Sequence, residues 1–92
     1  MVLEIGGDIG ALIMYLDEEL ERTEISIEWE VDPSKDVHTG VWRRTAGTTN
    51  AVMAVYSELV EGRYFVPALN GHPAQSVDIR GGHVEEIDLR TR

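Results

Sequence analysis

The chain has 92 residues, of which 42% are apolar; it contains no cysteine, and its formal net charge is −9. This length and apolar content indicate one folded domain rather than a disordered chain, and the lack of cysteine excludes disulfides and thiolate sites. The negative charge repels phosphate backbones and anionic headgroups, so we expect neither nucleic acid nor a membrane as a partner.

The sequence shows no membrane-spanning or targeting signal. No stretch approaches the roughly 18 consecutive apolar residues that a membrane-spanning helix needs. The first residues, "MVLEIGGDIG", lack the basic region and the small-residue cleavage site of a secretory signal peptide. A cytoplasmic location is the expectation that follows.

The segment "GDIGALIMYLDEELERT", residues 7–23, is compatible with two structures. Its apolar residues recur at helical spacing after Asp8, a residue type that favours a helix N-cap. Against a helix, Gly10 would lie in the first turn, and the acidic residues 17–19 would lie near the negative end of the helix dipole. The run "ALIMYL" also suits a strand that is buried on both faces. We favour the strand, with a single turn from Asp17 to Leu20, and the helix remains the alternative.

The clearest strand is "EISIEWEV", Glu24 to Val31, in which apolar residues alternate strictly with polar ones. This period of two buries one face and exposes the other, whereas a helix would distribute the glutamates around its axis. Asp32-Pro33 then begins a loop, because a proline has no amide hydrogen to donate and disfavours helix at the preceding residue.

Two further strands are predicted about a hairpin in the middle of the chain. The first, Val37 to Thr45, contains Trp42 and two arginines, and the second runs from Ala51 to Tyr56. Between them, the small and polar residues 46–50 are typical of a hairpin turn.

The last third of the chain alternates between strands and glycine turns. Gly62 is placed to adopt a positive φ, after which residues 63–69 form a strand that ends at the hairpin signal Asn70-Gly71. The stretches "SVDIR" and "HVEEIDL" flank Gly81-Gly82 as one more hairpin. Their apolar alternation slips between residues 84 and 87, which predicts a β-bulge or strand end near Glu85-Glu86.

These elements predict an all-β fold: a single antiparallel β-sandwich of about seven strands that spans residues 1–92. The sequence contains no internal repeat and no low-complexity segment. The expected core consists of Ile13, Ile25, Ile27, Trp29, Ala54, Tyr56, Leu59, Tyr64, Val66, Val77, Ile79, Ile87 and Leu89.

The stretch "VYSELVEGRYFVPALNGHPAQSVDIRGGHVEEIDL" resembles the C-terminal half of the prealbumin-like, carboxypeptidase-regulatory (Cna-B type) β-sandwich. The shared pattern is an aromatic residue, a leucine, a glycine turn, Gly-x-Tyr-x-Val, a strand, a second glycine turn and a final apolar strand. The resemblance implies a fold and no particular function. The chain also resembles small actinobacterial proteins. The matching positions are Tyr56, Leu59, Gly62, Tyr64, Val66, Val77, Ile79, Gly82, Val84, Ile87 and Leu89.

Two activities of related domains are not expected here. Some Cna-B domains join a strand lysine to an asparagine, but the one lysine of this chain, Lys35, lies in the predicted loop "DPSKD". Transthyretin-related enzymes that hydrolyse 5-hydroxyisourate end in Tyr-Arg-Gly-Ser, whereas this chain ends in "IDLRTR".

The candidates for catalysis or metal binding are the three histidines, His38, His72 and His83, each predicted at a loop or turn. Two of them have a carboxylate two residues away, in the pairs Asp36/His38 and His83/Glu85. Two ligands make a weak site, since zinc usually takes three or four from the protein. No serine lies in a nucleophile elbow, and no phosphate-binding loop is present. We therefore expect no cofactor, and a small hydrolase or metal-dependent enzyme that uses these histidines is the alternative function.

Binding is better supported than catalysis. Trp29 shares the apolar face of its strand, whereas Trp42 has arginine neighbours and is the better candidate for an exposed ring. A pair of tryptophans can also form a carbohydrate platform, which nothing else in the sequence supports. Arg43 and Arg44 are the positive spot of an acidic half and can receive the acidic face of a second copy. We predict a non-enzymatic, intracellular protein-binding module that forms a homodimer, with Trp42, Arg43 and Arg44 as its contact surface.

Overall fold

The structure is a computed structural model of the chain and describes residues 5–32, 34–69 and 71–91. These residues form seven β-strands and one 3-10 turn, and they contain no α-helix. They therefore include no helix that is long and apolar enough to cross a membrane. The predicted all-β fold is confirmed. The elements are β1 (Ile9–Tyr15), the 3-10 turn η1 (Glu18–Leu20), β2 (Glu24–Trp29), β3 (Asp36–Ala46), β4 (Thr49–Val60), β5 (Gly62–Val66), β6 (Gln75–Ile79) and β7 (Val84–Asp88).

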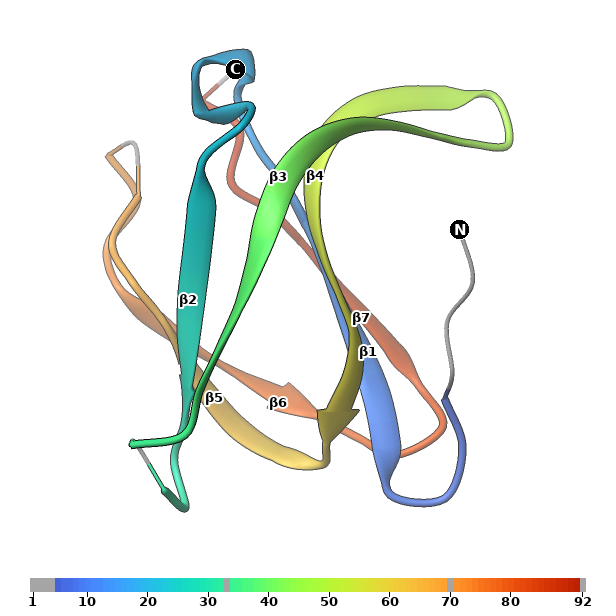
Figure 1. Cartoon of the computed structure of the whole chain (residues 1–92), viewed down its shortest axis with the longest axis vertical. Helices are drawn as coiled ribbons and strands as arrows, with labels where there is room; N and C mark the ends of the chain where they lie inside the picture. The colour runs from blue at the N-terminus through green and yellow to red at the C-terminus, as the bar shows by residue number, and fades with distance from the viewer. Residues whose placement is uncertain (1–4, 33, 70, 92) are drawn as a thin grey trace.

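The strands form one sheet in the order β6-β5-β2-β3-β4-β1-β7, and the sheet curls until it nearly closes into a barrel (Figure 1). The curl depends on β3, because its first half pairs with β2 and its second half, from Val41, pairs with β4. Below this point β3 and β4 separate, as Figure 1 shows. A single long strand thus belongs to both halves of the sheet.

One strand pair is parallel, so the expectation of an entirely antiparallel sheet is wrong. β7 runs beside β1 in the same direction, from the pair Ala11–Val84 to the pair Tyr15–Asp88. Parallel neighbours require a long crossover connection, and here the five intervening strands provide it. The first and last strands of the domain are therefore neighbours.

The N-terminal segment is a strand, as favoured, and η1 is the predicted single turn before β2. β1 lies between β4 and β7, and its central residues are buried on both faces. Leu12 and Met14 point into the main core, whereas Ile13 packs in a second cluster on the outer face of the sheet. Ile13 was expected in the main core. It lies between Leu12 and Met14, and because successive side chains of a strand point to opposite faces, it points to the outer one.

The irregularity predicted at Glu85-Glu86 is wrong, because β7 keeps its register from Val84 to Asp88. Val84 is simply on the outer face, where 39% of it is exposed, and the alternation continues past it. The register shift lies instead between β1 and β4, at Gly10. A Cβ atom at Gly10 would overlap the backbone carbonyl of Arg80, so this close approach requires glycine.

Several strand ends differ from the predicted ones. β2 ends at Trp29, and Val31 beyond it is 72% exposed. β4 is longer than the predicted 51–56 and reaches Val60, while β5 ends at Val66, short of residue 69. Pro33 and Asn70, which belong to predicted turns, lie outside the described residues.

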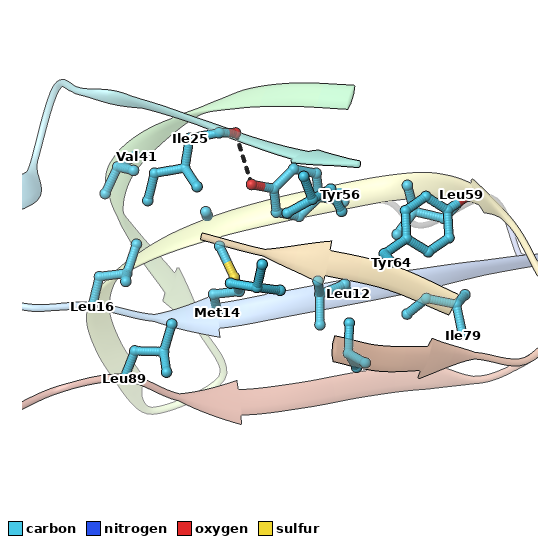
Figure 2. Packing of buried hydrophobic residues seen from close by; sticks show 14 of the residues in the cluster. Leu12, Met14, Leu16, Ile25, Val41, Tyr56, Leu59, Tyr64, Ile79 and Leu89 are labelled. Atoms are coloured by element: carbon cyan, nitrogen blue, oxygen red, sulfur yellow. Dashed lines mark hydrogen bonds between the residues drawn. The ribbon is translucent and has the colours of Figure 1, made fainter. Parts of the chain in front are cut away.

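The interior of the barrel is filled by side chains from all seven strands, and the hydroxyls of its two tyrosines are hydrogen-bonded (Figure 2). The Tyr56 hydroxyl donates a hydrogen bond to the carbonyl of Ile25, at 2.8 Å, and the Tyr64 hydroxyl donates to the carbonyl of Val60, at 2.7 Å. Of the predicted core, Trp29 and Ile87 are only partly buried. The buried residues of this cluster are Leu12, Met14, Leu16, Ile25, Ile27, Val41, Val52, Ala54, Tyr56, Leu59, Tyr64, Val66, Val77, Ile79 and Leu89.

Candidate binding surface

Trp42 lies on the outer face of β3, as predicted, and 49% of it is exposed. Its cross-strand neighbour on β4 is Met53, which also faces outward. The indole ring lies along its own strand, over Gly40, where a Cβ atom would collide with it. Trp42 therefore presents a flat apolar surface that is held in place by the strand beneath it.

The outer face beside Trp42 is apolar and was not foreseen as a unit. Ile13, Ala51, Met53 and Val55 form a buried cluster there, against which Tyr15 packs. The signal in the sequence is the run "AVMAVY", in which both alternating rows are apolar. Such a run predicts a strand that is buried on both faces.

Arg43 is directed toward the end of the barrel rather than onto the outer face. Its Nη2 donates to Oε1 of Glu18 at 2.6 Å, and both side chains are exposed. An exposed ion pair contributes only about 0–1 kcal/mol and is easily exchanged. The arginine is thus within reach of another carboxylate.

Arg44 lies on the outer face, opposite Ala51 on β4, and is half-buried. Its Nε is buried and has no hydrogen-bond partner within the described part of the chain. A buried donor without an acceptor is unfavourable. The described residues therefore leave one polar group of Arg44 without a hydrogen bond.

The backbone of β3 has an unpaired edge next to these side chains. Val41 donates to the carbonyl of Thr23 and accepts from the amide of Arg22, and these are the last bonds on that side. Because backbone groups alternate along a strand, Arg43 and residue 45 direct theirs to the same side, where β3 extends past Glu24, the first residue of β2. We call residues 42–46 the β3 edge; none of the described residues pairs with it on this side.

A hollow at the end of the barrel lies beside the β3 edge and is lined by charged groups that are already paired. Asp17 is buried and accepts hydrogen bonds from the amide and the hydroxyl of Thr91, the latter at 2.8 Å. Arg90 donates to both carboxylate oxygens of Asp88, and these bonds lower the pKa of Asp88 to about 2. The bonds between Asp17 and Thr91 hold the last described residues against the barrel.

The three histidines do not converge. His38 lies on β3 in the hollow where β3 and β4 separate, His72 lies in the turn after β5, and His83 lies in the turn before β7. His83 uses its carbonyl to accept the amide of Ala11. Across residues 5–32, 34–69 and 71–91, no group of three or more His, Asp or Glu side chains is arranged to hold a metal ion. Among the described residues, the histidines therefore belong to no cluster that could hold a metal ion.

The two tryptophans do not share a platform, although β2 and β3 are neighbours. Trp29 belongs to the inner row with Ile25 and Ile27, and its ring lies against Gly62. Trp42 belongs to the outer row. The two rings therefore do not lie on one face of the sheet.

Comparison with protein-family models, with curated proteins and with solved structures gives no match. The choice of a functional surface rests on the geometry of this chain. That geometry places an exposed tryptophan, two arginines and an unpaired strand edge together on β3.

Proposed function

We propose that this protein is a non-enzymatic binding module that recognises a protein partner through the β3 edge. The observation that carries the proposal is the set of unpaired backbone groups of Arg43 and residue 45, on the β3 edge beside the exposed ring of Trp42. An unpaired edge offers main-chain hydrogen bonds to an extended partner, and an adjacent aromatic ring adds apolar contact area.

The proposed partner is a second copy of the chain. Arg43 and Arg44 are positive in a molecule with a net charge of −9, so they attract the acidic surface of another copy.

We also propose that the fold is related to the prealbumin-like sandwiches that the sequence resembles. Seven strands in a sheet that turns back on itself support it, although β1 and β7 pair in parallel.

Reversing the two charges tests this function. Sedimentation equilibrium of the chain with Arg43→Glu and Arg44→Glu should show monomer at concentrations where the unaltered chain associates, because acidic side chains at the edge repel an acidic partner. The matched control carries Arg63→Glu and Arg80→Glu, which reverse two exposed arginines away from β3. Equal association of all three proteins would contradict the proposal.

A further inference from the structure

The two terminal strands of the sheet, β6 and β7, each have one edge that no described strand pairs with, and the edge of β7 is acidic. β7 pairs with β1 on one side, and none of the described strands pairs with it on the other. Its sequence is "VEEID", and of its acids Asp88 is already held by Arg90 of the same chain. Glu85 and Glu86 therefore provide the available negative charge, and Val84 provides exposed apolar surface.

β3 and β7 run in the same direction. β3 is antiparallel to β4, β4 is antiparallel to β1, and β1 is parallel to β7. A second copy placed beside the first in the same orientation would thus bring its β3 next to β7 as a parallel strand. The half-sheet β3-β4-β1-β7 would continue from one copy into the next.

Charge and burial favour one register for such a pair. Only shifts of two residues keep outer rows together, because a shift of one turns every side chain to the opposite face. In one of these registers Val84 lies opposite Trp42, Glu85 opposite Arg43, and Glu86 opposite Arg44. A shift of two in either direction breaks at least one of the two charge pairs and separates the two exposed apolar side chains.

We propose that copies of this chain associate head to tail, with the β7 edge of one copy adding to the β3 edge of the next as a parallel strand. This inference rests on the proposed function, that the β3 edge is a binding surface. Pairing of like edges is disfavoured, since two β3 edges would bring arginine against arginine and two β7 edges would bring glutamate against glutamate. Because the two edges differ, the association does not close at two copies.

Internal contacts of these side chains leave atoms for the partner. Glu18 binds Nη2 of Arg43, and no described residue binds its Nε or Nη1. Tyr15 donates to Oε2 of Glu86, and within the described residues Oε1 accepts no bond. The paired edges can thus form without breaking either internal contact.

Two charge-reversed variants test the inference, one with Arg43→Glu and Arg44→Glu and one with Glu85→Arg and Glu86→Arg. Sedimentation velocity of the unaltered chain should show species larger than a dimer at high concentration, and each variant alone should be monomeric. An equimolar mixture should regain association into species larger than a dimer, because the intact edges of the two variants are complementary and their reversed edges, acidic on β3 and basic on β7, are complementary too. Glu28→Arg with Glu30→Arg, both exposed on or beside β2, is the matched control and should associate like the unaltered chain.

The outcomes separate this inference from the proposed function. If the arginine variant is monomeric while the Glu85/Glu86 variant associates normally, the β7 edge is not the partner, and the proposed function stands. A wild-type complex that stops at two copies also overturns the head-to-tail arrangement. A chain that is monomeric at every concentration overturns both. Circular dichroism shows whether the variant with Glu85→Arg and Glu86→Arg folds. If it does not, the milder variant with Glu85→Gln and Glu86→Gln should still associate more than about tenfold more weakly than the unaltered chain.

Discussion

Tyr56 shows how a polar atom is accommodated inside this barrel. Its ring is buried in the main cluster, and its hydroxyl donates to the Ile25 carbonyl across the interior, which ties β4 to β2 (Figure 2). These two strands are not neighbours in the sheet, because β3 lies between them. Burial raises the pKa of the Tyr56 hydroxyl well above its ordinary value of 10.0, because the charged form would lose its hydration.

Replacing Tyr56 with phenylalanine should lower the free energy of unfolding by about 1 kcal/mol at neutral pH, since it removes one buried hydrogen bond. The stabilising contribution of a group whose pKa is raised on folding is complete below its unfolded pKa and is lost as the pH rises toward the folded one. The unaltered chain should therefore lose stability above about pH 10, and Tyr56→Phe should lose less. Urea unfolding at several pH values measures both effects.

Tyr15→Phe is the control for this experiment at neutral pH. Its hydroxyl bonds only to the exposed carboxylate of Glu86, so its removal should cost less than about 0.5 kcal/mol. An equal loss in both variants would show that the buried bond to Ile25 is not the source of the effect.

At the scale of the element, alternation predicted the strands best where one face is exposed. "EISIEWEV" is unambiguous because its glutamates face solvent, and β2 begins at the predicted residue. β1 and β4 are buried on both faces, so their apolar runs show no alternation of apolar and polar residues. For β1 the sequence is therefore compatible with a helix as well as with a strand. Their assignment as strands depends on which strands lie beside them, and a single sequence does not contain that information.

Part of the candidate site could likewise be predicted from the sequence, and part could not. Exposure of Trp42 follows from its arginine neighbours and could be predicted. The unpaired β3 edge could not, because it arises where β3 continues past Glu24, the first residue of β2, and that depends on the register of the two strands. The parallel position of β7, which places an acidic edge at the other end of the half-sheet, has no local signal at all.

Leu59 and Val60 are adjacent on β4 and test the alternation of inner and outer positions. Leu59 is 1% exposed and lies in the main cluster, whereas Val60 is 42% exposed. Leu59→Ala should lower the free energy of unfolding by about 2–5 kcal/mol, because it leaves a cavity. Val60→Ala should change it by less than about 0.5 kcal/mol. Chemical denaturation of the two variants measures the contrast, and a loss under about 1 kcal/mol for Leu59→Ala would place that side chain outside the core.

At the scale of the whole molecule, the first and last strands of the domain pair with each other. β1 is paired on one side by β4 and on the other by β7, so the last strand completes the surroundings of the first (Figure 1). Beyond β7, Leu89 is buried in the main cluster, and Thr91 bonds to the buried carboxylate of Asp17. The barrel therefore depends on contacts between residues that are far apart in sequence, which form late and at a high entropic cost.

A chain that ends at His83 should fail to fold. Without β7, one edge of β1 loses its pairing, Leu12 and Met14 lose the cover of Ile87 and Leu89, and the core is open to water. Two-dimensional NMR should show collapsed amide dispersion for this chain. A chain that ends at Arg90 is the control; among the described contacts it loses the Thr91 bonds to Asp17, and it should remain folded with a loss of about 1–3 kcal/mol. Well-dispersed spectra from the shorter chain would mean that β1 to β6 form a sufficient core and that β7 is an accessory strand.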